Sequence, residues 1–91
     1  MPDKIRCSHI LVKTEQEARE ILEDLQHGVD FAKLAQQKSV CPSGKHGGDL
    51  GTFGRGMMVK PFEKAAFELQ KGQMSGLVKT EFGWHIIKRL E

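Results

Sequence analysis

The order of strand-like and helix-like periodicity along this chain limits the folds that it can form. Alternating side chains predict strands over residues 5–12 and 83–90, and two shorter strands are expected over residues 49–53 and 77–79. Apolar residues at helical spacing predict two helices after the first strand and one after the second. The order strand–helix–helix–strand–helix–strand–strand is typical of an α+β domain, in which helices cover a small sheet.

Capping signals define the three helices. Thr14 opens a Thr-Glu-Gln-Glu capping box, and Gly28 ends the helix that follows. Asp30 is a good N-cap for a second, shorter helix. Pro61 lies where a first helical turn tolerates proline, and we expect this third helix to end near Gly72.

The first strand carries apolar residues on both faces, which indicates a central position in the sheet. Ile5, Cys7, His9 and Leu11 share one face, and the intervening residues share the other. In the last strand, His85 faces opposite Trp84. We therefore expect Trp84 to have a structural role.

Helical and strand periodicity disappear between residues 39 and 56. This segment contains six of the ten glycines. Gly47, Gly48 and Gly51 predict tight backbone turns around a short strand. We expect Gly47 and Gly48 to set the shape of this loop rather than to contact a substrate.

Length and composition exclude several classes of protein. Ninety-one residues allow one domain over residues 1–91, and a net charge of +2 is too small to indicate nucleic acid binding. No apolar run approaches the roughly 20 residues of a membrane span, and the start at Met1 lacks the apolar region of a signal peptide. Two cysteines are too few for a disulfide scaffold, so we expect a cytoplasmic protein with free thiols. Nothing resembles a heptad seam, which favours a monomer.

Two histidines, His9 and His85, lie within the first and last predicted strands. A single histidine among aliphatic neighbours is more often a hydrogen-bonded core residue than a ligand or a base. These two can pair if their strands are neighbours in the sheet. Thr80 could then bond a ring nitrogen, and Cys41 could supply a thiol from the glycine-rich segment.

Three kinds of chemistry could use these side chains. In a Cys-His hydrolase, Cys41 would be a nucleophile activated by His9 or His85. A zinc site could combine both histidines with His46 and a cysteine, but the usual metal-ligand spacings are absent. The third possibility is non-covalent catalysis of bond rotation. Spacing alone gives little support to the hydrolase or to the zinc site, and it does not identify the third chemistry.

Four sequence blocks resemble the signature of the parvulin family of peptidyl-prolyl cis/trans isomerases, or rotamases. They are residues 8–12 (SHILV), 41–51 (CPSGKHGGDLG), 58–63 (MVKPFE) and 82–87 (FGWHII), in the family's order and spacing. The match extends from Ile5 to Arg89, and the length resembles the single-domain prokaryotic members. Each block is weak evidence by itself, but four in order are strong.

The resemblance implies a parvulin-like (FKBP-like) fold, a four-stranded antiparallel sheet surrounded by helices. It implies an enzyme that needs no cofactor and no metal, and that assists protein folding by rotating X-Pro bonds. The polar active-site network would comprise His9, Cys41, Thr80 and His85. The pocket for the proline ring would comprise Leu50, Met58 and Phe62, with Phe82 near its rim.

One departure from the family bears on the substrate. Phosphate-directed parvulins carry several Arg and Lys residues between the first strand and the first helix, whereas here that connection holds only Lys13. Without a bidentate arginine to grip a phosphate, we expect unfolded or extended chains with unphosphorylated X-Pro bonds as substrates.

Two alternatives to this enzyme stay open. A parvulin-like domain can be a non-catalytic chaperone module that binds proline-containing segments. A membrane or polyanion surface could also be contacted through lysines, although the net charge disfavours this. The lysines concerned are Lys60, Lys64, Lys71 and Lys79.

Overall fold

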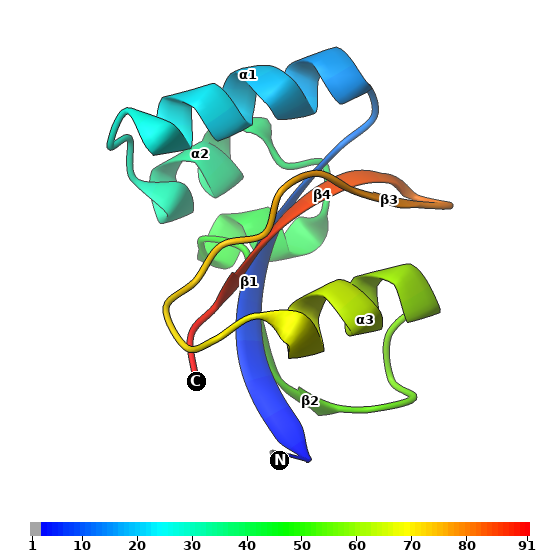
Figure 1. The fold of residues 1–91 in the computed structure, drawn as a ribbon. Coiled ribbons are helices and arrows are strands. Elements are labelled where there is room, and N and C mark those ends of the chain that lie inside the picture. The colour runs from blue at the N-terminus through cyan, green and yellow to red at the C-terminus, as the bar shows by residue number, and fades with distance from the viewer. Residues whose placement is uncertain (1–2) are drawn as a thin grey trace.

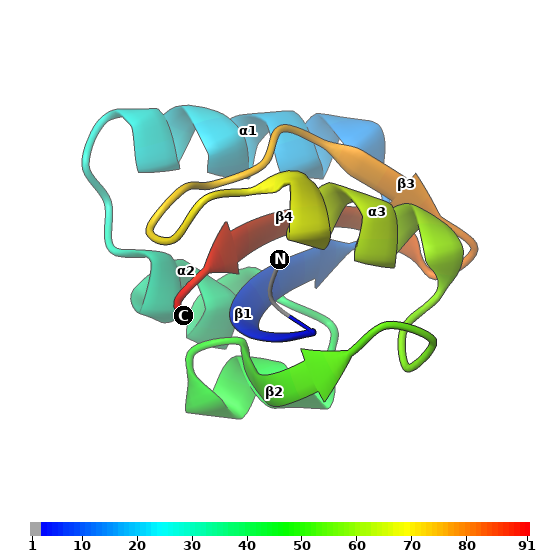
Figure 2. The same ribbon diagram turned by 60° about the horizontal axis from the view of Figure 1, so that its bottom comes forward.

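A computed structural model describes residues 3–91, and its centre is one four-stranded antiparallel sheet (Figure 1). Met1 and Pro2, which begin the segment expected not to be a signal peptide, lie outside this range. The strands are β1 (Lys4–Val12), β2 (Asp49–Gly54), β3 (Val78–Thr80) and β4 (Gly83–Arg89). Their order in the sheet is β2-β1-β4-β3, so the first and last strands are central neighbours, while β2 and β3 form its edges (Figure 2).

In the part of the chain that the structure describes, three α-helices cover the two faces of this sheet. Helices α1 (Glu15–Gln26) and α2 (Phe31–Lys38) lie on one side, and α3 (Lys60–Glu68) lies on the other (Figure 1). A short 3-10 helix, η1 (Pro42–His46), lies in the glycine-rich segment. Within residues 3–91, no helix combines the length and the apolar character that crossing a bilayer requires. The predicted α+β class, element order and antiparallel sheet are confirmed.

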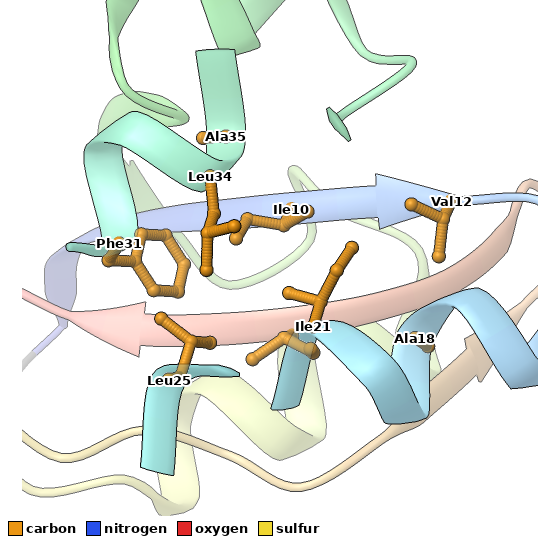
Figure 3. Close-up of a cluster of buried hydrophobic side chains, with 9 residues drawn as sticks. Ile10, Val12, Ala18, Ile21, Leu25, Phe31, Leu34 and Ala35 are labelled. Atoms are coloured by element: carbon orange, nitrogen blue, oxygen red, sulfur yellow. The ribbon is translucent and has the colours of Figure 1, made fainter. Parts of the chain in front are cut away.

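The alternation of side chains along β1 places an apolar core on each face. Ile10 and Val12 point toward α1 and α2, where they meet Ile21 and Phe31 among other buried residues (Figure 3). Ile5 and Cys7 belong to the opposite core, beneath α3. Each apolar face of the central strands is thereby removed from water, which supplies the main driving force for folding. The expected central position of the first strand is confirmed.

Trp84 lies opposite His85, as expected. It packs against the core beneath α1, and the Nζ atom of Lys79 lies 4.9 Å from the centroid of its ring. This cation–π contact joins two neighbouring strands, β3 and β4. The structural role expected for Trp84 fits this position.

The helix ends differ from the sequence predictions at two places. The hydroxyl of Thr14 accepts a hydrogen bond from the N–H of Glu17 at 3.2 Å, but it donates to the Glu17 carboxylate, which does not reach back to the backbone of the cap. Helix α3 ends at Glu68, before the predicted end near Gly72. The physical reason is that Leu69 leaves the helix to enter the core, where its carbonyl accepts from the guanidinium of Arg89 at 2.7 Å.

Candidate active site

His9 and His85 are diagonal neighbours on the two central strands. In the ladder, His9 pairs with Ile87 and Leu11 pairs with His85, so both imidazoles project from the face that α3 covers. Their Nδ1 atoms are 3.0 Å apart, and the two rings are stacked with an interplanar angle of 20°. One Nδ1 therefore carries the proton and donates to the other.

Thr80 extends this hydrogen-bonded pair at the end of β3. Its Oγ1 lies 2.7 Å from Nε2 of His85 and accepts from the backbone N–H of Phe82 at 3.1 Å. Thr80, His85 and His9 are all buried. A continuous polar chain thus runs from the β3–β4 turn to the middle of β1.

Burial keeps both imidazoles neutral. Removal from water lowers the pKa of His9 to about 4, and the nearby ring of His85 acts in the same direction. Burial likewise lowers the pKa of His85 to about 4. At neutral pH the pair therefore presents no positive charge.

Phe62 of α3 packs over the two imidazoles. Its ring is nearly perpendicular to both imidazoles, with centroid distances of 5.5 Å to His9 and 5.3 Å to His85. Nε2 of His9 is buried and has no hydrogen-bond partner among the described residues. The ring of Phe62 therefore contributes to the burial of both imidazoles.

A pocket of about 560 Å³ opens beside this network. Seven of the eight predicted site residues line it: His9, Cys41, Leu50, Met58, Phe62, Phe82 and His85. Thr80, the eighth, lies behind His85 and reaches the pocket only through that ring. The walls are mainly aliphatic, aromatic and thioether side chains, a surface suited to an apolar ring.

The glycine-rich segment packs against the backbone of His9, which lines this pocket. Gly47 and Gly48 have φ values of 71° and 87°, in the left-handed region that favours glycine. The carbonyl of Gly48 accepts from the backbone N–H of His9 at 2.9 Å, and a Cβ atom on Gly48 would lie 2.3 Å from the carbonyl oxygen of His9. Neither glycine lines the pocket, as the sequence indicated.

Cys41 lies in the pocket wall, apart from the histidine network. Its Sγ accepts from the hydroxyl of Ser43 at 3.3 Å, and within residues 3–91 no hydrogen bond joins it to His9 or His85. The structure therefore joins three of the four side chains expected in the polar network. A nucleophilic role for Cys41 lacks its activating base in this arrangement.

The metal-site alternative has no geometric support among the described residues. His46 is exposed on η1, and in residues 3–91 no three His, Cys, Asp or Glu side chains gather as metal ligands would. The exposed lysines considered for surface contact, Lys60, Lys64, Lys71 and Lys79, do not line the pocket.

Sequence reasoning missed six residues that also line the pocket: Leu11, Lys13, Val40, Pro42, Met57 and Val59. Leu11 shares its strand face with His9, so alternation along β1 could have found it. Val40 and Met57 are 53% and 68% exposed, and they lie at the rim beside Cys41 and Met58. No periodic signal marks them, because they belong to loops.

Comparison with known proteins agrees with this geometry. The family described as "Rotamase: PPIC-type PPIASE domain" matches residues 9–91. The foldase protein PrsA of Geobacillus sp. (strain WCH70) is 60% identical over 86 residues, which make up 93% of this chain and 31% of that protein. The chain thus spans less than a third of the length of this curated relative.

Solved structures have the same fold. The crystal structure of PrsA from Bacillus subtilis matches with a TM-score of 0.95 and 47% identity, over 98% of this chain and 35% of that one. The solution structure of NmPin, the parvulin of Nitrosopumilus maritimus, matches with a TM-score of 0.88 and 53% identity, over 100% of this chain and 99% of that one. Since the family match extends over most of the sequence, this chain belongs to the PPIC-type peptidyl-prolyl isomerases, the parvulins.

Proposed function

We propose that this protein rotates unphosphorylated X-Pro bonds in unfolded or extended polypeptides, and thereby assists their folding. The observation that carries the proposal is an apolar pocket whose floor is a neutral, hydrogen-bonded histidine pair. Such a floor offers no charge to a polar substrate, and it keeps its shape because the network fixes both rings.

Bond rotation demands little chemistry from the protein. The barrier of about 18–20 kcal/mol comes from amide resonance, and no covalent bond has to break. A thousandfold acceleration needs only about 4 kcal/mol of transition-state stabilisation. The planar amide is more dipolar than the twisted one, so an apolar surround favours the twisted state relative to the planar one.

Each group of side chains has a distinct role in this proposal. Met58, Phe62 and Leu50 hold the proline ring, and Phe82 contacts residues beside it. His9 and His85, fixed by Thr80, give the pocket its shape and exclude water. Cys41 is a wall of the pocket and does not attack the substrate.

The charges at the pocket support an unphosphorylated substrate. Within residues 3–91, Lys13 is the one Lys or Arg that lines the pocket, and its Nζ already donates to the carbonyl of Phe82 at 3.4 Å. A single lysine is a point charge without the bidentate geometry that arginine offers to phosphate.

A second candidate is a binding module that holds extended chains without rotating their bonds. Val40, Met57 and Phe82 expose apolar side chains at the pocket rim, which is a surface that an unfolded segment can bind. A chain from a structure of Campylobacter jejuni proteins described as SurA-like chaperones is 42% identical to this chain with a TM-score of 0.92, and this chain covers 39% of it. Catalysis and holding can use the same pocket.

NMR exchange spectroscopy on two matched tetrapeptides distinguishes catalysis of bond rotation from binding without rotation. The peptides differ only in whether the serine before proline carries a phosphate. We expect the protein to accelerate exchange in the unphosphorylated peptide at least as well as in the phosphorylated one. Acceleration of the phosphopeptide alone would contradict the proposed substrate, and binding without acceleration of either would favour the holding module.

Three further expectations belong with this proposal. Cys7 and Cys41 are free thiols, which supports a reducing, cytoplasmic location. We propose a monomer, which sedimentation equilibrium tests, and a single catalytic domain over residues 1–91. Cell fractionation tests the location, and recovery of the protein outside the cytoplasm would contradict it.

A further inference from the structure

An irregularity in the β1–β2 ladder lies next to the pocket. Arg6 pairs with Thr52 and Ser8 pairs with Asp49, and the register shifts between the two pairs. Between these pairs β1 has one residue, Cys7, whereas β2 has two, Leu50 and Gly51. One extra residue on one strand is a β-bulge, and Gly51 within it has a positive φ of 74°, a conformation that glycine adopts readily.

The bulge reverses the alternation of side chains along β2. Phe53 pairs with Ile5 and faces the core beneath α3. Strict alternation from Phe53 would turn Leu50 to the opposite face of the sheet. The extra residue instead returns Leu50 to the α3 side, where it packs against that core and lines the pocket.

Asp49 bonds to both sides of this bulge. Its Oδ1 accepts from the N–H of Gly51 at 2.8 Å, which closes a turn around Leu50. Both carboxylate oxygens also accept from the guanidinium of Arg6 on β1. The carboxylate therefore ties the bulged residue to the neighbouring strand.

We propose that Asp49, with Arg6 and Gly51, is a positioning residue that holds the bulge and so turns Leu50 into the proline pocket. None of the three touches the pocket, and they act on the substrate only through Leu50. The part of this inference that concerns substrate binding rests on the proposed function. The part that concerns the orientation of Leu50 does not.

A double-mutant cycle between Asp49 and Leu50 tests the coupling. Leu50→Ala removes part of the pocket wall and should raise KM for an X-Pro peptide about fivefold. Asp49→Ala should raise KM by a similar factor and leave kcat within about twofold, because it releases Leu50 from the pocket. If so, Leu50→Ala should change KM by less than about twofold in the Asp49→Ala background.

Two further variants make the assignment specific. Asp49→Asn keeps an acceptor for the Gly51 N–H and should restore KM to within about twofold of the original protein. Glu15→Ala breaks the exposed ion pair with Arg19 on α1 and should leave KM unchanged. Multiplicative effects of Asp49→Ala and Leu50→Ala, near 25-fold together, would overturn the proposal.

A structural readout keeps the test independent of activity. In the original protein, NOEs are expected between the Leu50 methyl groups and the aromatic rings of the core beneath α3. Asp49→Ala should remove them while the NOEs of Ile10 on the other face persist. If these Leu50 NOEs survive in the Asp49→Ala variant, Asp49 does not position Leu50. The NOE result decides the orientation of Leu50 whether or not the protein proves to be an isomerase.

Discussion

His9 and His85 lie 76 positions apart in the sequence, yet their Nδ1 atoms are 3.0 Å apart in a hydrogen bond. The contact exists because β1 and β4 are central neighbours, paired so that the two residues are diagonal on one face. Phe62 closes that face, and burial makes the charged form of either ring unfavourable. Residues from opposite ends of the chain therefore form the uncharged floor of the pocket.

The stability of the protein should fall when the pH drops below about 6.5. Both histidines have an ordinary pKa of 6.5 and a pKa of about 4 in the folded state, so between these values the unfolded chain binds more protons. The free energy of unfolding should fall by up to about 1.4 kcal/mol per pH unit for each histidine in this window, and this contribution should be constant above it. Urea unfolding from pH 7.5 to pH 4.5 measures the slope.

The two exposed histidines provide the matched control. The double variant His27→Gln, His46→Gln should keep the full pH dependence, because neither ring is buried. If the free energy of unfolding of the original protein does not change between pH 6.5 and pH 4.5, the buried pair does not resist protonation.

Cys41→Ser should keep most of the isomerase activity. Its sulfur has no bond to either histidine among the described residues, and serine preserves a polar wall of similar size. We expect kcat/KM to fall less than about tenfold, whereas loss of a nucleophile costs on the order of a thousandfold or more. Peptide exchange rates with the variant check this, and a near-complete loss would revive covalent chemistry.

Met58→Ala should weaken substrate binding more than turnover. Met58 lines the pocket, so its truncation should raise KM about five- to tenfold. Met74→Ala is the control, because Met74 is also half-buried but packs against the core on the opposite face. It should lower stability by about 1 kcal/mol or more and leave KM unchanged. If Met58→Ala left KM unaltered, the proline ring would bind elsewhere.

Gly48→Ala should destabilise the fold by about 3 kcal/mol or more, because the new methyl group clashes with the His9 carbonyl oxygen in a left-handed backbone conformation. Gly76→Ala should be neutral to within about 0.5 kcal/mol, since an added Cβ there meets nothing within 4 Å. Thermal unfolding of the two variants compares them directly. Equal melting temperatures of the two variants would mean that the loop accommodates the methyl group at position 48 without strain.

Much of the fold follows from local sequence patterns. The alternation along residues 5–12 predicts both faces of β1, and Asp30 begins its helix as expected, with its carboxylate accepting from the N–H of Lys33 at 3.1 Å. These signals depend only on residues that are close in the sequence, so they can be recognised without knowledge of the tertiary contacts. The antiparallel sheet itself came from the family resemblance, and the structure confirms it.

Features that depend on distant contacts were not predictable in this way. Helix α3 stops early because Arg89, far along the chain, binds the carbonyl of Leu69. The bulge at Leu50 is visible only in the pairing of β2 with β1, and the rim residues Val40 and Met57 line the same pocket only after folding. The family resemblance places Cys41 in the histidine network, whereas in the structure its sulfur accepts from Ser43, a near neighbour, so this difference has a local cause.

The central claim is that this pocket accelerates rotation about X-Pro bonds. Its most direct test is two-dimensional NMR exchange spectroscopy on an unphosphorylated X-Pro tetrapeptide, with catalytic amounts of protein and no coupling protease. We predict that the cis/trans exchange rate rises in proportion to protein concentration and that Phe62→Ala abolishes most of the increase. An exchange rate that stays at the uncatalysed value while the peptide binds saturably would contradict this claim.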